Sequence, residues 1–141
     1  MSTRCQLGVF QNKDAEIYNC DVYVYKHSDG YPGKADGSEF GVLPLILPFL
    51  EDFQKLRGIS DFSYCAARLV QHLTNDSDKT RAYPEFRMLG YGLDCGGAKG
   101  IHGDIEFFYH ISPEAVKVFQ THNPDDPKTW KLIEEIALEP R

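Results

Sequence analysis

The chain has 141 residues, of which 42% are hydrophobic and 26% are charged, an ordinary composition for a folded domain. This composition favours neither a disordered nor a fibrous protein, and the length suffices for one domain, residues 1–141, with a buried core. Fifteen basic residues against twenty-one acidic ones leave a formal net charge of -6. Because binding to a duplex relies on a surplus of basic residues, we expect no double-stranded DNA partner.

The cysteines are far apart in the sequence and form neither a C-x-x-C pair nor a zinc-finger spacing. They are Cys5, Cys20, Cys65 and Cys95. We therefore expect reduced thiols, no structural metal and no cofactor. The first residues lack the apolar core of a secretion signal, and no run approaches ~18 consecutive apolar residues. The sequence thus favours a cytoplasmic protein that has no membrane partner.

The N-terminal part of the sequence predicts a hairpin. Residues 5–10 form a short apolar run, and a polar turn separates them from a second extended run over residues 17–27. Side chains alternate across a strand, so His27 is expected on the same face as Tyr23 and Tyr25. Both faces of this second strand carry large apolar groups, which indicates a central position in a sheet.

Two helices are expected next. The first spans residues 41–57, where apolar side chains recur at helical spacing and Gly58 follows as a stop signal. Pro44 and Pro48 complicate its start, because proline is tolerated only in the first turn. The regular helix therefore either begins at Pro48 or is kinked there. A second amphipathic helix is expected over residues 62–73.

The remaining elements are predicted as three strands and a final helix. The strands are expected over residues 86–93, 105–111 and 115–122, with the last two forming a hairpin. Asp126 as N-cap and Pro127 at the first helical position predict a helix over 127–138. This order does not alternate regularly between strand and helix. It favours an α+β fold, with a mainly antiparallel sheet of about five strands packed against two or three helices.

Two glycine-rich loops are the most informative segments for function. Residues 28–38 read SDGYPGKADGS, and residues 94–104 read DCGGAKGIHGD. Their composition supplies turns and positive φ angles, and binding groups are often carried on such loops.

Each of these loops places a histidine two residues before an aspartate. The pairs are His27 with Asp29, and His102 with Asp104. If the loops meet at one edge of the sheet, the four side chains can support acid–base chemistry or hold a divalent ion. The alternative is structural, because Asp-Gly is a common turn former and a histidine at a strand end is often a hydrogen-bonded surface group.

Three further residues are candidates for ligand binding. Tyr25 and Tyr31 are aromatic surfaces on which a base could stack, although core packing explains such tyrosines equally well. Lys99 lies in the segment CGGAKG, where backbone amides and a positive charge could hold an anion. This segment does not match a P-loop, and a simple hairpin-type loop is the competing interpretation.

Several of these residues recur in a pattern that is similar to a known group of sequences. The pattern is Thr3-Arg4 at the start, then Tyr25-x-His27-x-Asp29-Gly30-Tyr31-Pro32, an apolar helix after Gly41-Val42, and Gly103-Asp104-Ile105-Glu106-Phe107-x-Tyr109. It resembles an uncharacterised family of small phage and prophage proteins. The resemblance implies a shared role for the His-Asp-Gly-Tyr-Pro loop and an intracellular accessory protein of a mobile element.

Two functions follow as hypotheses. The first is a compact protein that binds a small molecule or a host protein through the two glycine-rich loops and acts by inhibition or sequestration. The second is a small metal-dependent hydrolase or nuclease-like enzyme, in which Asp29 and Asp104 bind a metal while His27 or His102 moves protons. The two hypotheses differ in geometry, because the enzyme needs these four side chains around one point.

Overall fold

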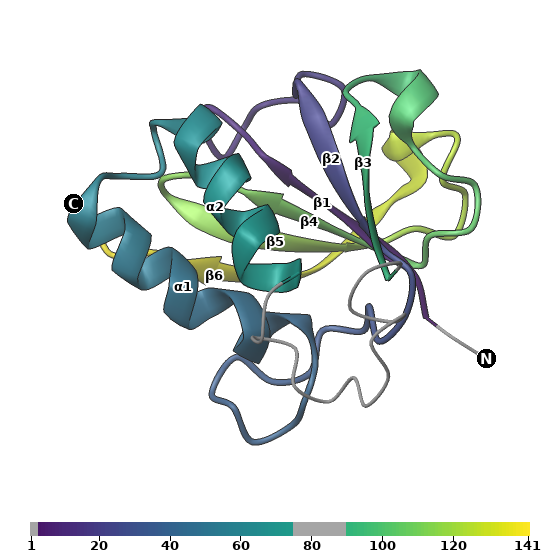
Figure 1. Ribbon diagram of the computed structural model, residues 1–141. Coiled ribbons are helices and arrows are strands. Elements are labelled where there is room, and N and C mark those ends of the chain that lie inside the picture. Colours follow the sequence, from purple (N-terminus) through teal and green to yellow (C-terminus); the bar gives the residue numbers. More distant parts are fainter. Residues whose placement is uncertain (1–2, 75–89) are drawn as a thin grey trace.

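The structure is a computed structural model that describes residues 3–74 and 90–141. Within these residues, six strands and two α-helices follow one another along the chain (Figure 1). The elements are β1 (Cys5–Val9), β2 (Val22–Lys26), α1 (Val42–Leu56), α2 (Phe62–Thr74), β3 (Tyr91–Cys95), β4 (Phe107–Ile111), β5 (Ala115–Gln120) and β6 (Lys131–Ala137). Short 3-10 turns lie at Ala98–Gly100 and Pro127–Thr129.

All six strands belong to one mixed sheet in the order β3-β2-β1-β4-β5-β6. The central pair, β1 and β4, is parallel, with Leu7 opposite Tyr109, and the other four pairings are antiparallel. This arrangement confirms the predicted α+β fold with a mainly antiparallel sheet. It also confirms the β1–β2 and β4–β5 hairpins, whereas the sheet has six strands where about five were expected.

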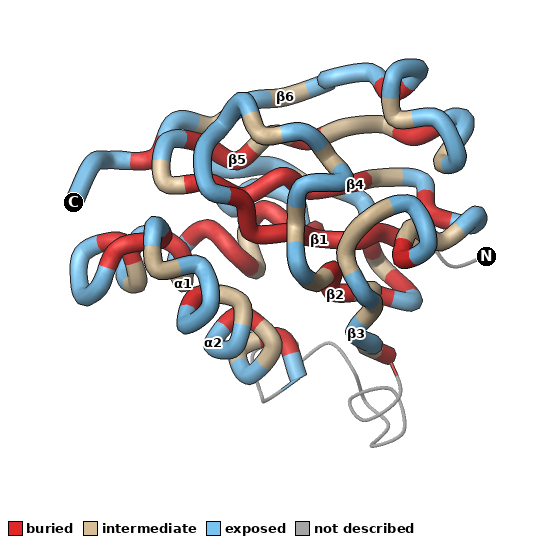
Figure 2. The backbone as a smooth tube through the Cα atoms, turned by 90° about the horizontal axis from the view of Figure 1, so that it is seen from above, coloured by how far each residue is buried: buried red, intermediate tan, exposed pale blue. Residues whose placement is uncertain are grey.

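Both helices cover the same face of the sheet (Figures 1 and 2). Their buried side chains recur every three or four residues, which places them in one stripe on each helix. These are Val42, Leu43, Ile46, Leu47 and Leu50 of α1, with Cys65, Leu69 and Leu73 of α2. They pack on Cys5, Leu7, Tyr109 and Ile111, which β1 and β4 direct toward this face. The main hydrophobic core therefore lies between the helices and the central parallel pair.

Helix α1 begins at Val42, six residues before Pro48. Pro44 lies in its first turn, where the missing N–H has no intrahelical partner in any case. Pro48 is inside the helix, so the expectation that the regular helix begins there is wrong. Gly58 ends the helix as predicted: its φ is 95°, and its N–H donates to the Phe53 carbonyl at 2.9 Å.

The predicted helix over 127–138 is wrong. Asp126 does cap a turn, since its side chain accepts from the Lys128 N–H at 3.2 Å, but the turn ends at Thr129. The chain then forms β6, which pairs with β5 from Ala115 opposite Ala137 to Gln120 opposite Lys131. The open edge of β5 competed for this segment, and tertiary pairing prevailed over a local helix signal.

Two other boundaries differ from the sequence-based prediction. The strand expected over 17–27 is shorter and begins at Val22, because residues 11–21 form a loop across the sheet. The strand expected over 86–93 lies partly outside the described residues, and the described strand β3 runs from Tyr91 to Cys95.

The second face of the sheet is covered by loops around a hydrophobic cluster that is mostly aromatic. Its buried members are Phe10, Tyr23, Ile105, Phe108 and Trp130. His110 joins them from β4: its ring stacks on Phe10 with centroids 3.8 Å apart, and its Nε2 donates to the Ala15 carbonyl at 2.9 Å. Burial of this ring lowers the pKa of His110 below its usual value of 6.5.

We predict a loss of stability on acidification that depends on His110. A histidine whose pKa is lowered in the folded state contributes its full stability above the pKa that the same side chain has in the unfolded chain, about 6.5. This contribution is lost progressively as the pH falls below that value. His110→Phe should therefore flatten the decrease of the melting temperature between pH 7 and pH 5. The measurement is a thermal denaturation series for both proteins. An identical pH slope in wild type and variant would contradict the assignment to His110.

Candidate functional site

Polar side chains gather on the loop-covered face, where β2 ends and β1 begins. They come from β1, β2 and β3, from the residues just before β1 and just after β2, and from the segment after the Ala98–Gly100 turn, which returns along the sheet to enter β4 (Figure 1). We call them the polar cluster. It consists of Arg4, Gln6, Tyr25, His27, Asp94, His102 and Asp104.

Gln6 organises one half of the polar cluster. Its side chain is fully buried, and its Nε2 donates to the Gly100 carbonyl at 2.7 Å and to Asp94 Oδ2 at 3.2 Å. Its Oε1 accepts from the backbone N–H of His102 at 3.0 Å. The imidazole of His102 then donates from Nε2 to the same Asp94 oxygen at 2.9 Å. One amide thus holds both partners of an Asp94–His102 pair.

Tyr25 organises the other half. Its hydroxyl donates to Asp104 Oδ2 at 2.9 Å, and the Arg4 Nε lies 3.0 Å from that same oxygen. The Tyr25 ring stacks on the His102 ring with centroids 4.0 Å apart, and the hydroxyl is 3.4 Å from His27 Nδ1. On the other side of the imidazole, His102 Nδ1 is 3.9 Å from Asp104 Oδ1. His102 therefore lies between two carboxylates and under an aromatic ring.

The tyrosine hydroxyl keeps its proton throughout the neutral pH range. Partial burial, together with the hydrogen bond to the Asp104 carboxylate, raises the pKa of Tyr25 to about 12. Tyr25 therefore acts as a hydrogen-bond donor in the polar cluster, and its proton remains between the hydroxyl and Asp104.

Two glycines of the loop after β3 lie where the chain packs too closely for a side chain. A Cβ at Gly96 would lie 1.4 Å from the Cys20 carbonyl oxygen, and one at Gly100 would lie 1.6 Å from that of Cys95. Close approach to neighbouring backbone thus explains both glycines. Lys99 is exposed in the 3-10 turn, and in the described part of the chain it makes no contact with the polar cluster.

The structure brings together three of the four residues in the predicted histidine–aspartate pairs. His27 and Asp104 meet through Tyr25, and His102 lies beside Asp104. The carboxylates that contact His102 are Asp94 and Asp104, and Asp29 is not one of them. Asp29 lies in the turn after β2 with a φ of 54°.

Two tyrosines named as ligand-binding candidates have different positions. Tyr25 is in the polar cluster, whereas the Tyr31 ring packs edge-on against Phe40 with centroids 6.3 Å apart. Gln6 and Asp94 were not predicted from the sequence as site residues. A glutamine within the apolar run CQLGV was a usable signal, because a polar residue in a buried strand needs partners.

The described residues were compared with the requirements of a metal site, a disulfide and a membrane-spanning helix. Among the described residues, no group of three or more His, Cys, Asp or Glu side chains is arranged to hold a metal ion. All four cysteines are free thiols, as expected. In the described ranges, no helix is long and apolar enough to cross a membrane.

Comparison with known proteins adds no further information on the site. No protein-family model matches the chain, and neither a curated protein nor a solved structure matches it.

We predict that Gln6→Leu destabilises the fold by about 2–4 kcal/mol, because each buried polar group left without a partner costs about 1–3 kcal/mol. The groups concerned are the Gly100 carbonyl and the His102 N–H. Urea denaturation measures the loss, and amide hydrogen exchange should show faster exchange at His102. The exposed Gln11→Leu serves as the matched control. A Gln6→Leu protein as stable as this control would show that the amide does not hold the loop.

Proposed function

We propose that the protein is a small binding protein that captures a small polar ligand at the polar cluster. The observation that supports this most strongly is a set of partly exposed hydrogen-bond donors and acceptors. The fully buried Gln6 holds part of this set in place through its hydrogen bonds to Asp94, Gly100 and His102. Side chains that are already held in place lose little entropy when a ligand binds. Such pre-organisation is typical of a recognition site.

The composition of the polar cluster defines the kind of ligand. The side chains of Arg4, His102 and Asp104 are between 31% and 48% exposed, so a ligand can reach groups of both charge signs. The stacked rings of Tyr25 and His102 add an aromatic surface. These groups favour a planar molecule that carries both hydrogen-bond donors and acceptors, such as a nucleotide.

The resemblance to small phage and prophage proteins supports the interpretation as an accessory protein that sequesters or inhibits. In that role a host protein is the alternative occupant of the same surface. Small-molecule binding is the stronger proposal, because the polar cluster combines charges with an aromatic stack within one small area.

A hydrolytic enzyme is the second candidate, and one observation favours it. Asp94 accepts from His102 Nε2 at 2.9 Å and so orients the imidazole, which is how a carboxylate positions a histidine for acid–base catalysis. Under this proposal His102 is the proton-transferring group. The metal-dependent form of the proposal assigns the metal to Asp29 and Asp104.

A thermal-shift screen tests the proposed function. We expect a nucleotide or cyclic nucleotide to raise the melting temperature of the wild type, since a ligand at 100 times its dissociation constant adds about 2.7 kcal/mol of stability. Asp104→Asn and His102→Gln should each reduce this shift. Asp52→Asn, an exposed aspartate on α1, is the matched control and should keep it.

Other outcomes of the same screen separate the alternatives. A shift caused by divalent metals that disappears in Asp29→Ala would favour the metal-dependent enzyme. A wild type that responds to none of the compounds would contradict small-ligand binding and direct the search to a protein partner. A ligand-induced shift of equal size in all the variants would place the binding site away from the polar cluster.

A further inference from the structure

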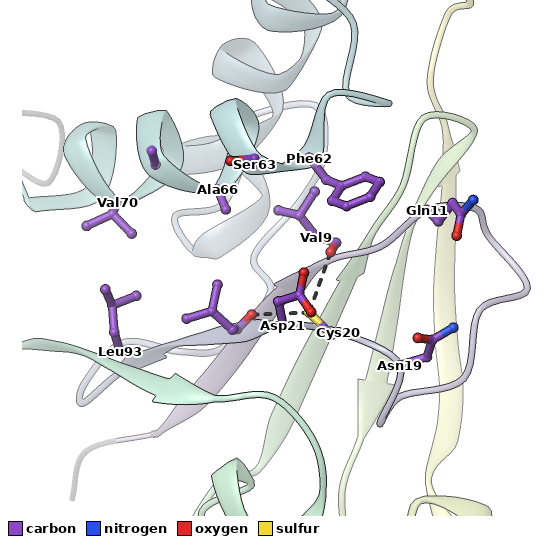
Figure 3. Close-up of a pocket in the computed structure, with 12 residues that line it drawn as sticks. Val9, Gln11, Asn19, Cys20, Asp21, Phe62, Ser63, Ala66, Val70 and Leu93 are labelled. Carbon is purple, nitrogen blue, oxygen red and sulfur yellow. Dashed lines mark hydrogen bonds between the residues drawn. The ribbon is translucent and has the colours of Figure 1, made fainter.

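A cavity of about 450 Å³ lies between α2 and the β1–β2–β3 side of the sheet, on the face that the helices cover (Figure 3). This volume is within the range of about 300–1,000 Å³ that is typical of small-molecule sites. The wall is mostly apolar, and its polar side chains lie at residues 19–21, at Gln11 and at Ser63 on α2. The lining residues used below are Val22, Phe62, Ala66, Val70, Leu93 and Asp21.

The cavity exists because α2 has small side chains where it faces the edge of the sheet. Cys65 and Leu69 are buried in the core, whereas Ala66 and Val70, on the adjacent side of the helix, are only partly covered. Across the gap, Leu93 on β3 is 60% exposed, and Phe62 at the start of α2 is 37% exposed. In the described ranges, two apolar walls thus face each other across the cavity, which favours an apolar guest.

Hydrogen bonds hold the backbone at the polar end of the cavity. The Cys20 thiol contacts the Val22 carbonyl at 3.1 Å and the Val9 carbonyl at 3.5 Å, as the dashed lines in Figure 3 show. On the other side, the Gly96 N–H donates to the Asp21 carbonyl at 2.9 Å. These contacts fix the backbone that carries the Asp21 carboxylate. The backbone of Asp21 is therefore held in place where its acidic side chain borders the apolar cavity.

Charge identifies the ligand class. Among the described residues that line the cavity, Asp21 is the only charged one, and the other polar groups there are neutral amides, a thiol and a hydroxyl. The net charge of -6 adds a long-range attraction for cations. We propose that this cavity binds a small amphipathic amine, with its apolar body between Ala66 and Leu93 and its ammonium group at Asp21.

This site is independent of the polar cluster. Successive side chains of a strand point to opposite faces, so β3 directs Leu93 into the cavity and Asp94 toward His102 on the other face. A ligand at one site does not occupy the other. The proposal for the cavity thus does not rest on the function proposed for the polar cluster.

Three probes of equal chain length test the proposal by NMR titration of the full chain: octylamine, 1-octanol and octanoate. We expect octylamine to bind at residues Ala66, Val70 and Leu93, about fivefold more tightly than octanol, because a partly exposed charge pair contributes up to about 1 kcal/mol. Octanoate should bind most weakly. In Asp21→Asn the advantage of octylamine over octanol should disappear, whereas Asp52→Asn, the matched control, should retain it.

Two further variants test the location. Leu93→Asn removes an exposed apolar wall and should weaken octylamine and octanol binding together, while Ala66→Trp fills the cavity and should abolish both. Equal affinity for the amine and the carboxylate would overturn the assignment of the ligand class. Absence of binding by all three probes, or binding that both Leu93→Asn and Ala66→Trp leave unchanged, would overturn the site itself.

Discussion

The amide of Gln6 has to find its hydrogen-bond partners inside the protein, and much of the molecule is arranged around this constraint. β1 is buried along its whole length and is paired on both edges, so water is not available to its side chains. The partners come from residues about ninety positions later, Asp94, Gly100 and His102. Because an unpaired amide is costly there, the loop after β3 must return across the sheet. The polar cluster is assembled by this return.

A second buried glutamine does the same at the other end of the molecule. Gln54 on α1 donates to the carbonyls of Pro113 and Glu139 and accepts from the Ile59 N–H. It thereby ties the helix to the β4–β5 turn and to the C-terminal segment. In both places a side-chain amide serves backbone groups in irregular segments that have no strand or helix partner. The two glutamines thus connect these irregular segments to β1 and to α1 by hydrogen bonds.

Local patterns in the sequence predicted most elements, and long-range contacts decided the rest. The two hairpins and α2 follow from alternation, turn residues and helical spacing, which act within a few residues. The Asp126–Pro127 signal failed because pairing with β5, a non-local contact, determined the conformation of residues 131–137. The two similar loops raised the question of whether His27 and His102 lie near each other, and local patterns left it open. Asp94 was not predicted as the partner of His102, because this contact depends on the tertiary position of Gln6.

The parallel pairing of β1 with β4 affects how the chain folds as it is synthesised. Cys5 pairs with Phe107, so one edge of the central strand stays open until most of the polypeptide has emerged from the ribosome. The β1–β2 hairpin can form early, but the contact that completes the core requires closure of a loop of about a hundred residues, which is entropically unfavourable. Until β4 has been synthesised, the unpaired edge of β1 is therefore exposed to pairing with strands of other chains.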